Sequence, residues 1–219
     1  VHLRLKENGQ QSLKQSKTNK KFVYLISPNK IKDESFYTNL DLVLSSKKIS
    51  FFQLRLKKET NLNKLIIGKK IKKICKKYKV KFLINDDPLL AKKLNADGCH
   101  LGQKDMDLIK ARKILKKKII GVTCHNSINL AKIAIKAGAD YLAFGAFYTS
   151  KTKTVKYKAS LRILKSVKQI TFLPIVAIGG IKLNNYKKLL LNKANFLAIS
   201  GYIWNNKKYK PLEAIKKLK

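Results

Sequence analysis

Short apolar runs alternate with lysine-rich amphipathic segments along this chain, and this alternation constrains the fold more than any other feature. Eight apolar runs of strand length occur, at 21–27, 51–56, 81–85, 97–102, 119–123, 140–145, 174–179 and 195–200. Apolar residues at three- and four-residue spacing predict amphipathic helices between them, most clearly over 62–78, 129–139 and 161–170. Strands that alternate with helices form a parallel sheet. Eight such units in about 200 residues predict an α/β fold, a single (β/α)8 TIM barrel.

An open, doubly wound parallel sheet is the main alternative architecture. No GxGxxG follows the first apolar run, which argues against a dinucleotide-binding version of that sheet. No linker or change of composition interrupts the chain after residue 21, so we expect one catalytic barrel domain over 21–219. Residues 1–20 form a short polar N-terminal extension whose composition is typical of a disordered segment.

The net charge of the chain raises the question of nucleic-acid binding. Lysine and arginine number 50 against 12 acidic residues, for a net charge of +38. Only four of the basic residues are arginine, the side chain that base recognition favours, and the lysines are spread over all the helical segments. We therefore expect a solvated lysine surface and no specific nucleic-acid partner, with weak, salt-sensitive binding to polyanions.

Membrane and disulfide signals are both weak in this sequence. There is no apolar run of about 18 residues, and the N-terminal segment lacks the apolar stretch of a signal peptide, so we expect no membrane partner and a cytoplasmic location. The three cysteines are too scattered for a disulfide framework. The dipeptides Cys99-His100 and Cys124-His125 suggest zinc, but neighbouring strand residues point to opposite faces, which favours cysteines as small core residues. No pattern in the chain specifies an oligomeric state.

Polar residues follow most of the apolar runs, where a barrel carries its catalytic groups. They are Gln53, Arg55 and Lys57, Asn85 and Asp86, Gly102, Gln103 and Asp105, Thr123, the segment 149–153, Gly179-Gly180 and Ser200-Gly201. The carboxyl ends of parallel strands meet at one end of a barrel, so these groups are predicted to share one mouth.

Five of the 12 acidic residues fall between Asp86 and Asp107, which predicts a local negative site. Mg²⁺ favours one or two carboxylates, keeps several waters and bridges substrate phosphates. Asp86 and Asp105, from adjacent strand ends, could supply that pair. An aspartate is also a good helix N-cap, which is the interpretation we prefer for Asp87 and an open alternative for Asp105.

Three cations and two glycine-containing stretches predict anion binding at the same mouth. Arg55 occupies an alternating position that should face the barrel interior, where a guanidinium needs an anion, and Lys57 and Lys153 add point charges. The stretches 174–180 and 196–201 end the seventh and eighth runs, and the loops there often bind phosphate through backbone N–H groups. A glycine-assisted turn is the alternative for these loops.

Taken in order, several segments of this chain resemble the thiamine-phosphate synthase family. The matching pieces are QLRLK (53–57), ND (85–86), ADGCHLGQKDM (96–106), GVTCHN (121–126), GADYLAFG (138–145), SKTK (150–153) and AIGGI (177–181). The resemblance runs from about Tyr24 to Ser200. Its last piece is generic to phosphate-binding barrels, whereas the combination of the earlier ones is specific.

The resemblance implies two phosphorylated small-molecule substrates, a hydroxymethylpyrimidine diphosphate and a thiazole phosphate, whose coupling releases diphosphate. It implies Mg²⁺ as cofactor, held by Asp86 and Asp105. Pyrimidine diphosphate contacts are implied for Gln53, Arg55, Lys57, Asn85, Thr123 and Lys153. Thiazole phosphate contacts are implied for Ser150, Lys151, Thr152, Gly180, Ile199 and Ser200. The nucleophile would be the ring nitrogen of the thiazole, so the protein need not provide one.

The chain departs from the family pattern mainly around the sixth strand end. Gly145-Ala146 stands where the family usually has Gly-Pro, Ser150 stands for a usual Thr, and 154–161 has no glycine. Two other functions are considered: a thiazole tautomerase on the same barrel, and a non-enzymatic basic binding protein. Such tautomerases tend to lose the strand-end carboxylates and cations, and a binding protein has no reason to keep carboxylates in a positive mouth. Their retention here favours the synthase.

Overall fold

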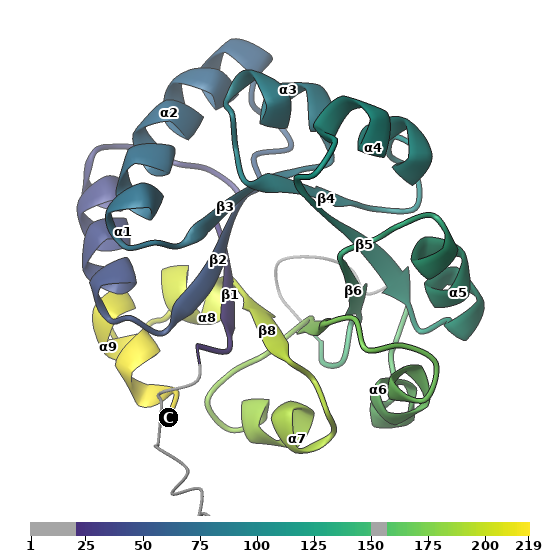
Figure 1. The fold of residues 1–219 in the computed structure, drawn as a ribbon. Helices are drawn as coiled ribbons and strands as arrows, with labels where there is room; N and C mark the ends of the chain where they lie inside the picture. Colours follow the sequence, from purple (N-terminus) through teal and green to yellow (C-terminus); the bar gives the residue numbers. More distant parts are fainter. Residues whose placement is uncertain (1–20, 150–156) are drawn as a thin grey trace, which may run out of the picture.

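The computed structural model describes residues 21–149 and 157–219 and is a closed parallel barrel (Figure 1). Each strand pairs with its sequence neighbours, and β8 pairs with β1 to close the ring. The predicted barrel is thus confirmed, because each of the eight apolar runs contains one strand or most of it. The strands are β1 (Val23–Ile26), β2 (Ile49–Leu54), β3 (Lys81–Asn85), β4 (Gly98–Leu101), β5 (Ile119–His125), β6 (Tyr141–Phe144), β7 (Ile175–Ile178) and β8 (Phe196–Ile199).

Helices form an outer layer around the strands (Figure 1). Several begin at residues whose side chains accept a hydrogen bond from the first turn: Thr60 from the Asn63 N–H at 3.2 Å, and Ser127 from the Leu130 N–H at 3.2 Å. The helices are α1 (Ser35–Ser45), α2 (Asn61–Lys77), α3 (Pro88–Lys93), α4 (Leu108–Leu115), α5 (Ile128–Lys136), α6 (Leu161–Lys168), α7 (Tyr186–Leu191), α8 (Gly201–Trp204) and α9 (Pro211–Lys217).

Alternate residues of each strand serve two separate layers of the core. On β3, Phe82 and Ile84 pack in the layer between the strands and the helices, whereas Leu83 packs inside the barrel. Asn85 has the same parity as Leu83 and therefore faces the interior at the end of the strand. A polar residue at the end of an apolar run is therefore placed at the end of the barrel, with its side chain directed into the interior.

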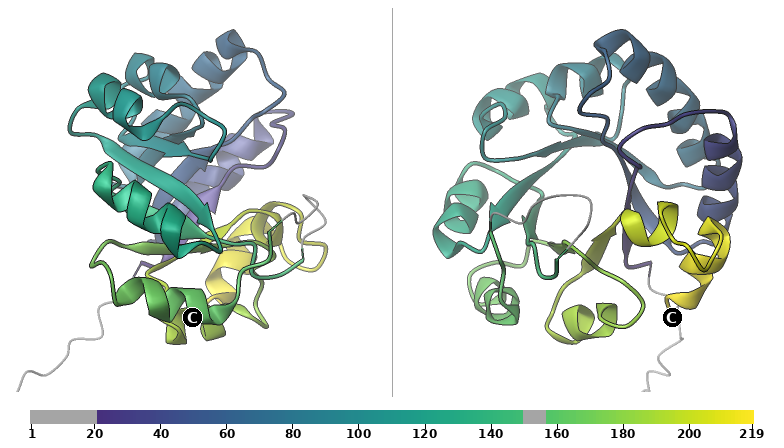
Figure 2. Two further views of the ribbon diagram at one scale, coloured as in Figure 1. Left: turned by 90° about the vertical axis from the view of Figure 1, so that its right-hand side faces the viewer. Right: turned by 180° about the vertical axis from the view of Figure 1, so that it is seen from behind.

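The short helix α8 is held at the mouth by contacts with the first part of the chain. The indole Nε1 of Trp204 donates to the carbonyl oxygen of Ile26 at 2.7 Å, and its ring lies 5.2 Å from that of Phe36, centroid to centroid. Side and rear views show α8 and α9 together beside the first strands (Figure 2). These contacts join the C-terminal part of the chain to its N-terminal part near the carboxyl ends of β1 and β8.

Two remaining sequence predictions concern the ends of the chain and membranes. The predicted polar extension, residues 1–20, lies outside the described residues. Within the part of the chain that the structure describes, no helix combines the length and apolar character needed to span a bilayer.

Candidate active site

Asp86 and Asp105 lie together at the ends of β3 and β4. Each of the two carboxyl groups shifts the pKa of the other. Lys57 places its Nζ 3.0 Å from Oδ2 of Asp86, and the backbone N–H of Gly102 donates to Oδ2 of Asp105 at 2.7 Å. Asp86 has a φ of 63°, in the left-handed region that few non-glycine residues adopt, so the chain turns sharply at this carboxylate.

The two carboxyl groups have opposite pKa shifts. Burial raises the pKa of Asp105, and the neighbouring Asp86 raises it further, against the Gly102 N–H. Burial also acts to raise the pKa of Asp86, but the hydrogen bonds from Asp105 and Lys57 outweigh it, and the net shift is downward. Asp105 is therefore the group that takes a proton when no cation is present.

This arrangement fits a hard divalent cation. Two carboxylates forced together favour either a shared proton or a bound positive charge. Among residues 21–149 and 157–219, no three His, Cys, Asp or Glu side chains gather as a metal cluster. A pair of carboxylate ligands suits Mg²⁺, which retains several waters, better than it suits Zn²⁺, which takes three or four protein ligands.

Arg55 lies just beyond the end of β2, two positions before the Lys57 that pairs with Asp86. Its backbone N–H donates to Oγ of Ser27 at 2.9 Å, and its Nη1 donates to Oδ1 of Asn29 at 3.2 Å. None of the ion pairs in the described parts of the chain involves Arg55. The guanidinium is thus held by neutral groups and keeps most of its donors for an anion.

Gln53, Asn85 and Thr123 are joined in a polar layer inside the barrel. Gln53 is 3% exposed, and its Nε2 donates to Oδ1 of Asn85. Oγ1 of Thr123 lies 2.8 Å from Nε2 of His100 on β4. The structure therefore brings together residues that the sequence places on three different strands.

The ends of β7 and β8 contribute mainly backbone. Gly180 has a φ of 61°, and a Cβ on it would lie 2.4 Å from the carbonyl oxygen of Thr149. The Ile199 side chain is 2% exposed and packs in the outer core, which leaves its backbone to face the mouth. Oγ of Ser200 donates to the carbonyl oxygen of Ser27 at 3.0 Å. The other predicted residues of this half, Ser150, Lys151, Thr152 and Lys153, lie outside the described residues.

The question of helix caps is resolved by hydrogen bonds. Asp87 is the N-cap of α3, with its Oδ1 accepting from the Leu90 N–H at 2.9 Å, as predicted. The N-cap of α4 is Asp107, not Asp105. Asp105 is therefore free of the structural role that was its main alternative.

The cysteine–histidine dipeptides separate as the strand geometry predicts. Cys99 and Cys124 are buried in the outer core with free thiols, whereas His100 faces the barrel interior. Burial raises the pKa of Cys99 and lowers the pKa of His100 to about 4. His100 is therefore a neutral interior side chain at neutral pH.

Tyr24, His100 and Tyr141 are members of the polar layer that sequence reasoning missed. Both tyrosines stand inside apolar runs and read as ordinary core residues. Each has the same strand parity as the inward-facing residues beside it, Ile26 for Tyr24 and Ala143 for Tyr141. That parity was the available signal, because it places a hydroxyl inside the barrel, where it needs a polar partner.

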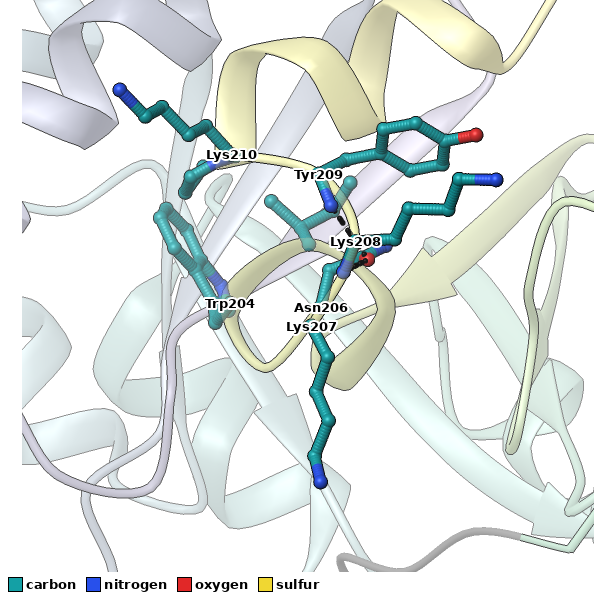
Figure 3. A pocket seen from close by; sticks show the side chains of 8 residues that line it. Trp204, Asn206, Lys207, Lys208, Tyr209 and Lys210 are labelled. Atoms are coloured by element: carbon teal, nitrogen blue, oxygen red, sulfur yellow. Dashed lines mark hydrogen bonds between the residues drawn. The ribbon is translucent and has the colours of Figure 1, made fainter.

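A hollow lies away from these groups, between α8 and α9 (Figure 3). Its volume is about 320 Å³. Lys207, Lys208 and Lys210 line it, but their ammonium groups point in different directions (Figure 3). Oδ1 of Asn206 accepts from the backbone N–H groups of Lys208 and Tyr209 at 2.9 and 3.0 Å, as in an ordinary turn. This hollow is therefore the outside of a loop and no convergent site.

Comparison with known proteins identifies the family. The family model described as thiamine monophosphate synthase matches residues 23–203. The thiamine-phosphate synthase of Pelagibacter ubique is 88% identical over 207 residues, which cover 94% of this chain and 100% of that protein. That of Erythrobacter litoralis is 40% identical over 84% of this chain and 88% of its own length. A thiamine phosphate pyrophosphorylase structure from Pyrococcus furiosus superimposes with a TM-score of 0.79 at 26% identity, covering 91% of this chain and 94% of that one. With Asp86, Asp105 and Arg55 at one mouth, this chain belongs to the thiamine-phosphate synthase family.

Proposed function

We propose that this protein catalyses the transferase step of thiamine biosynthesis, coupling 4-amino-2-methyl-5-(diphosphooxymethyl)pyrimidine to 4-methyl-5-(2-phosphoethyl)thiazole with release of diphosphate. One juxtaposition supports it beyond family membership: the Asp86–Asp105 pair meets the Lys57 ammonium at the mouth where Arg55 has no carboxylate partner among the described residues. A site that gathers both signs of charge suits a metal–diphosphate ligand.

The diphosphate half of the mouth is assigned to the ends of β2 to β5. Arg55 has a fork of donors that suits a phosphate, and Lys57 supplies a point charge beside it. Gln53, Asn85 and Thr123 line the adjoining polar layer and would hold the pyrimidine ring and its neighbouring oxygens. Lys153 is assigned to the same half by the family resemblance.

The thiazole phosphate is assigned to the ends of β7 and β8 and to the segment from Ser150 to Thr152. Gly180 permits a close backbone approach there because it carries no Cβ. Ile199 would contribute its backbone, and Ser200 its hydroxyl. The two substrates then approach each other across the mouth from opposite sides.

Asp86 and Asp105 would hold Mg²⁺, which supplies positive charge against the leaving diphosphate when bound. Arg55 and Lys57 neutralise the same developing charge from the protein side. The nucleophile is the thiazole nitrogen, so the protein's other task is to hold two rings in line and to keep water from the reacting carbon. His100 remains neutral and adds no competing charge. Three free thiols in the described chain fit a reducing cytoplasm as the place of the reaction.

The test is an incubation of purified protein with both substrates and Mg²⁺, with thiamine phosphate and diphosphate as the measured products. We expect both in equal amounts, and neither when EDTA removes the metal. An Asp87→Asn variant, which keeps the α3 cap, serves as a control and should retain the activity. Isomerisation of a thiazole phosphate without coupling would instead identify a tautomerase and overturn the proposal.

A further inference from the structure

A chain of hydrogen bonds crosses the barrel interior below the mouth. The Tyr24 hydroxyl donates to Oε1 of Gln53 at 2.7 Å, and it lies 2.8 Å from the hydroxyl of Tyr141. The Tyr141 hydroxyl lies 2.8 Å from Nδ1 of His100, whose Nε2 lies 2.8 Å from Oγ1 of Thr123. The chain thus links β1, β2, β4, β5 and β6 through side chains alone.

These bonds are closed to solvent over most of their length. Tyr24 is 1% exposed, and Gln53 and Tyr141 are each 3% exposed. Apolar side chains such as Leu83 and Val176 fill the barrel around them. Each buried hydroxyl must therefore find its donor and its acceptor within the chain itself.

Each hydroxyl and the neutral imidazole has a single proton to donate, so all the hydrogen bonds of the chain must point the same way along it. Tyr24 gives its proton to Gln53, so its oxygen accepts from Tyr141. The Tyr141 oxygen must then accept from Nδ1–H of His100. Burial lowers the pKa of His100 to about 4, so the neutral ring has a single N–H, and its bare Nε2 accepts from Thr123.

Only one other arrangement satisfies every group, and it reverses every bond. Turning the Gln53 amide over makes its Nε2 donate to Tyr24, and the protons then run toward Thr123. In that direction His100 carries its proton on Nε2 and donates to Thr123, whose own hydroxyl proton becomes free for a ligand. At the other end Asn85 must donate to Gln53, which leaves the Asn85 oxygen facing outward as an acceptor.

We propose that Tyr24, Tyr141 and His100 form a positioning relay that couples the hydrogen-bond direction at Thr123 to the direction at Gln53 and Asn85. A diphosphate oxygen accepts the Thr123 proton and thereby sets the far end to accept from a ring amino group. A pyrimidine with an oxo group in place of the amine would set its oxygen, an acceptor, against the Asn85 oxygen, also an acceptor, and would bind more weakly. This relay rests on the proposed function, because that proposal places the aminopyrimidine diphosphate between these two ends.

The first test follows the tautomer of His100 by ¹⁵N NMR, with the signal assigned by its loss in His100→Gln. The free protein should show the proton on Nδ1, and saturating inorganic diphosphate with Mg²⁺ should move it to Nε2. A tautomer that stays unchanged while diphosphate is bound would overturn the relay and leave the proposed function intact. Failure of diphosphate to bind would overturn the proposed function and the relay with it.

The second test measures the affinities of the amino- and oxo-pyrimidine diphosphates by calorimetry. One unpaired buried polar group predicts that the wild type prefers the amino compound by roughly 5- to 150-fold. Tyr141→Phe breaks the relay and should reduce this ratio to about 1 to 3 while diphosphate itself still binds. Tyr78→Phe is the matched control, since it removes a hydroxyl that hydrogen-bonds to Asp41 at 2.8 Å on the outer helices, and its ratio should equal that of the wild type.

Equal discrimination in Tyr141→Phe and Tyr78→Phe would contradict the relay. The NMR measurement uses unmodified protein, so the relay remains falsifiable even where the Tyr141→Phe variant does not fold. A merely structural role for Tyr141 would lower the stability of the barrel without changing the ratio of the two affinities.

Discussion

The mouth of the barrel has two sides that differ in the kind of group they present. On the side formed by β2 to β5, the groups at the mouth are charged and polar side chains such as Arg55, Asp86 and Thr123, to which we assign the diphosphate. On the side formed by β7 and β8, glycine and tightly packed backbone replace them, as at Gly180. The first side can be altered by removing a charged group, whereas a backbone contact such as that at Gly180 can be altered only by adding volume. Mutations should therefore separate the two half-sites.

The largest effect is expected for Arg55→Met. Loss of the guanidinium removes up to two charge-assisted hydrogen bonds to the diphosphate, while methionine keeps much of the stem volume. The affinity for the pyrimidine diphosphate should fall by roughly 10- to 10⁴-fold, and that for the thiazole phosphate should stay within about threefold. Calorimetric titration with each substrate separately measures this, and equal weakening of both would remove the distinction between the two sides.

Asp86→Asn should lower turnover with Mg²⁺ by about 100-fold or more, since it replaces one charge of a two-carboxylate site. Asp87→Asn, one residue further along, caps α3 and should leave turnover unchanged. Steady-state rates over a range of Mg²⁺ concentrations compare the two. Wild-type rates in Asp86→Asn would exclude it as a metal ligand.

Gly180→Ala tests the other side. The added Cβ would lie 2.4 Å from the Thr149 carbonyl oxygen, in a residue with a φ of 61°. The backbone must shift, so we expect the thiazole phosphate to bind about 10-fold more weakly, as for one lost hydrogen bond of ordinary strength. The pyrimidine diphosphate should bind as in the wild type, and a loss confined to that substrate would contradict the assignment.

The smallest effect concerns stability without metal. The pKa of Asp105 is raised in the folded state, so the protonated carboxyl is more stable in the folded protein than in the unfolded chain. This contribution to the free energy of unfolding is lost as the pH rises through the folded-state pKa. Asp105→Asn stays neutral and should melt at a slightly higher temperature than the wild type at pH 7.5 in EDTA.

The difference between Asp105→Asn and the wild type should vanish near pH 4, close to the unfolded pKa of about 3.9, where the wild-type carboxyl takes up its proton. Mg²⁺ should stabilise the wild type more than the variant. Asp107→Asn, which keeps the α4 cap, is the control. A lower melting temperature for metal-free Asp105→Asn at pH 7.5 would show that the carboxylate pair is not strained.

The two sides of the mouth also differ in how well their residues can be predicted from the sequence. A polar residue at the end of an apolar run, such as Asn85 or Asp86, can be placed at the mouth because strand alternation and parallel pairing fix its position. The contact expected of Ile199 came from the family resemblance alone, since a backbone contact leaves no trace in the residue type. Whether Asp105 or Asp107 caps α4 depended on the position of one helix start, which periodicity locates only within a few residues.

The polar layer inside the barrel could not be predicted from the sequence for a different reason. Tyr24 and Tyr141 lie 117 positions apart in the chain, and their contact depends on the closure of the whole barrel. Each tyrosine alone is indistinguishable from a core aromatic. The pairing becomes visible only when the inward residues of all strands are placed on one ring.

The contact between Gly121 and Tyr141 limits which residues the barrel interior can accept. A Cβ on Gly121 would lie 1.8 Å from Cζ of Tyr141, so the phenol ring occupies the space where a side chain would be. No other residue type can enter position 121 until the ring has gone, and once the ring has gone the vacated space favours a larger residue there. Positions 121 and 141 should therefore be epistatic for stability, with each change alone disturbing the packing of the barrel interior and the two together restoring it. A mutant library that varies them one at a time would miss the route by which this barrel could acquire a different interior.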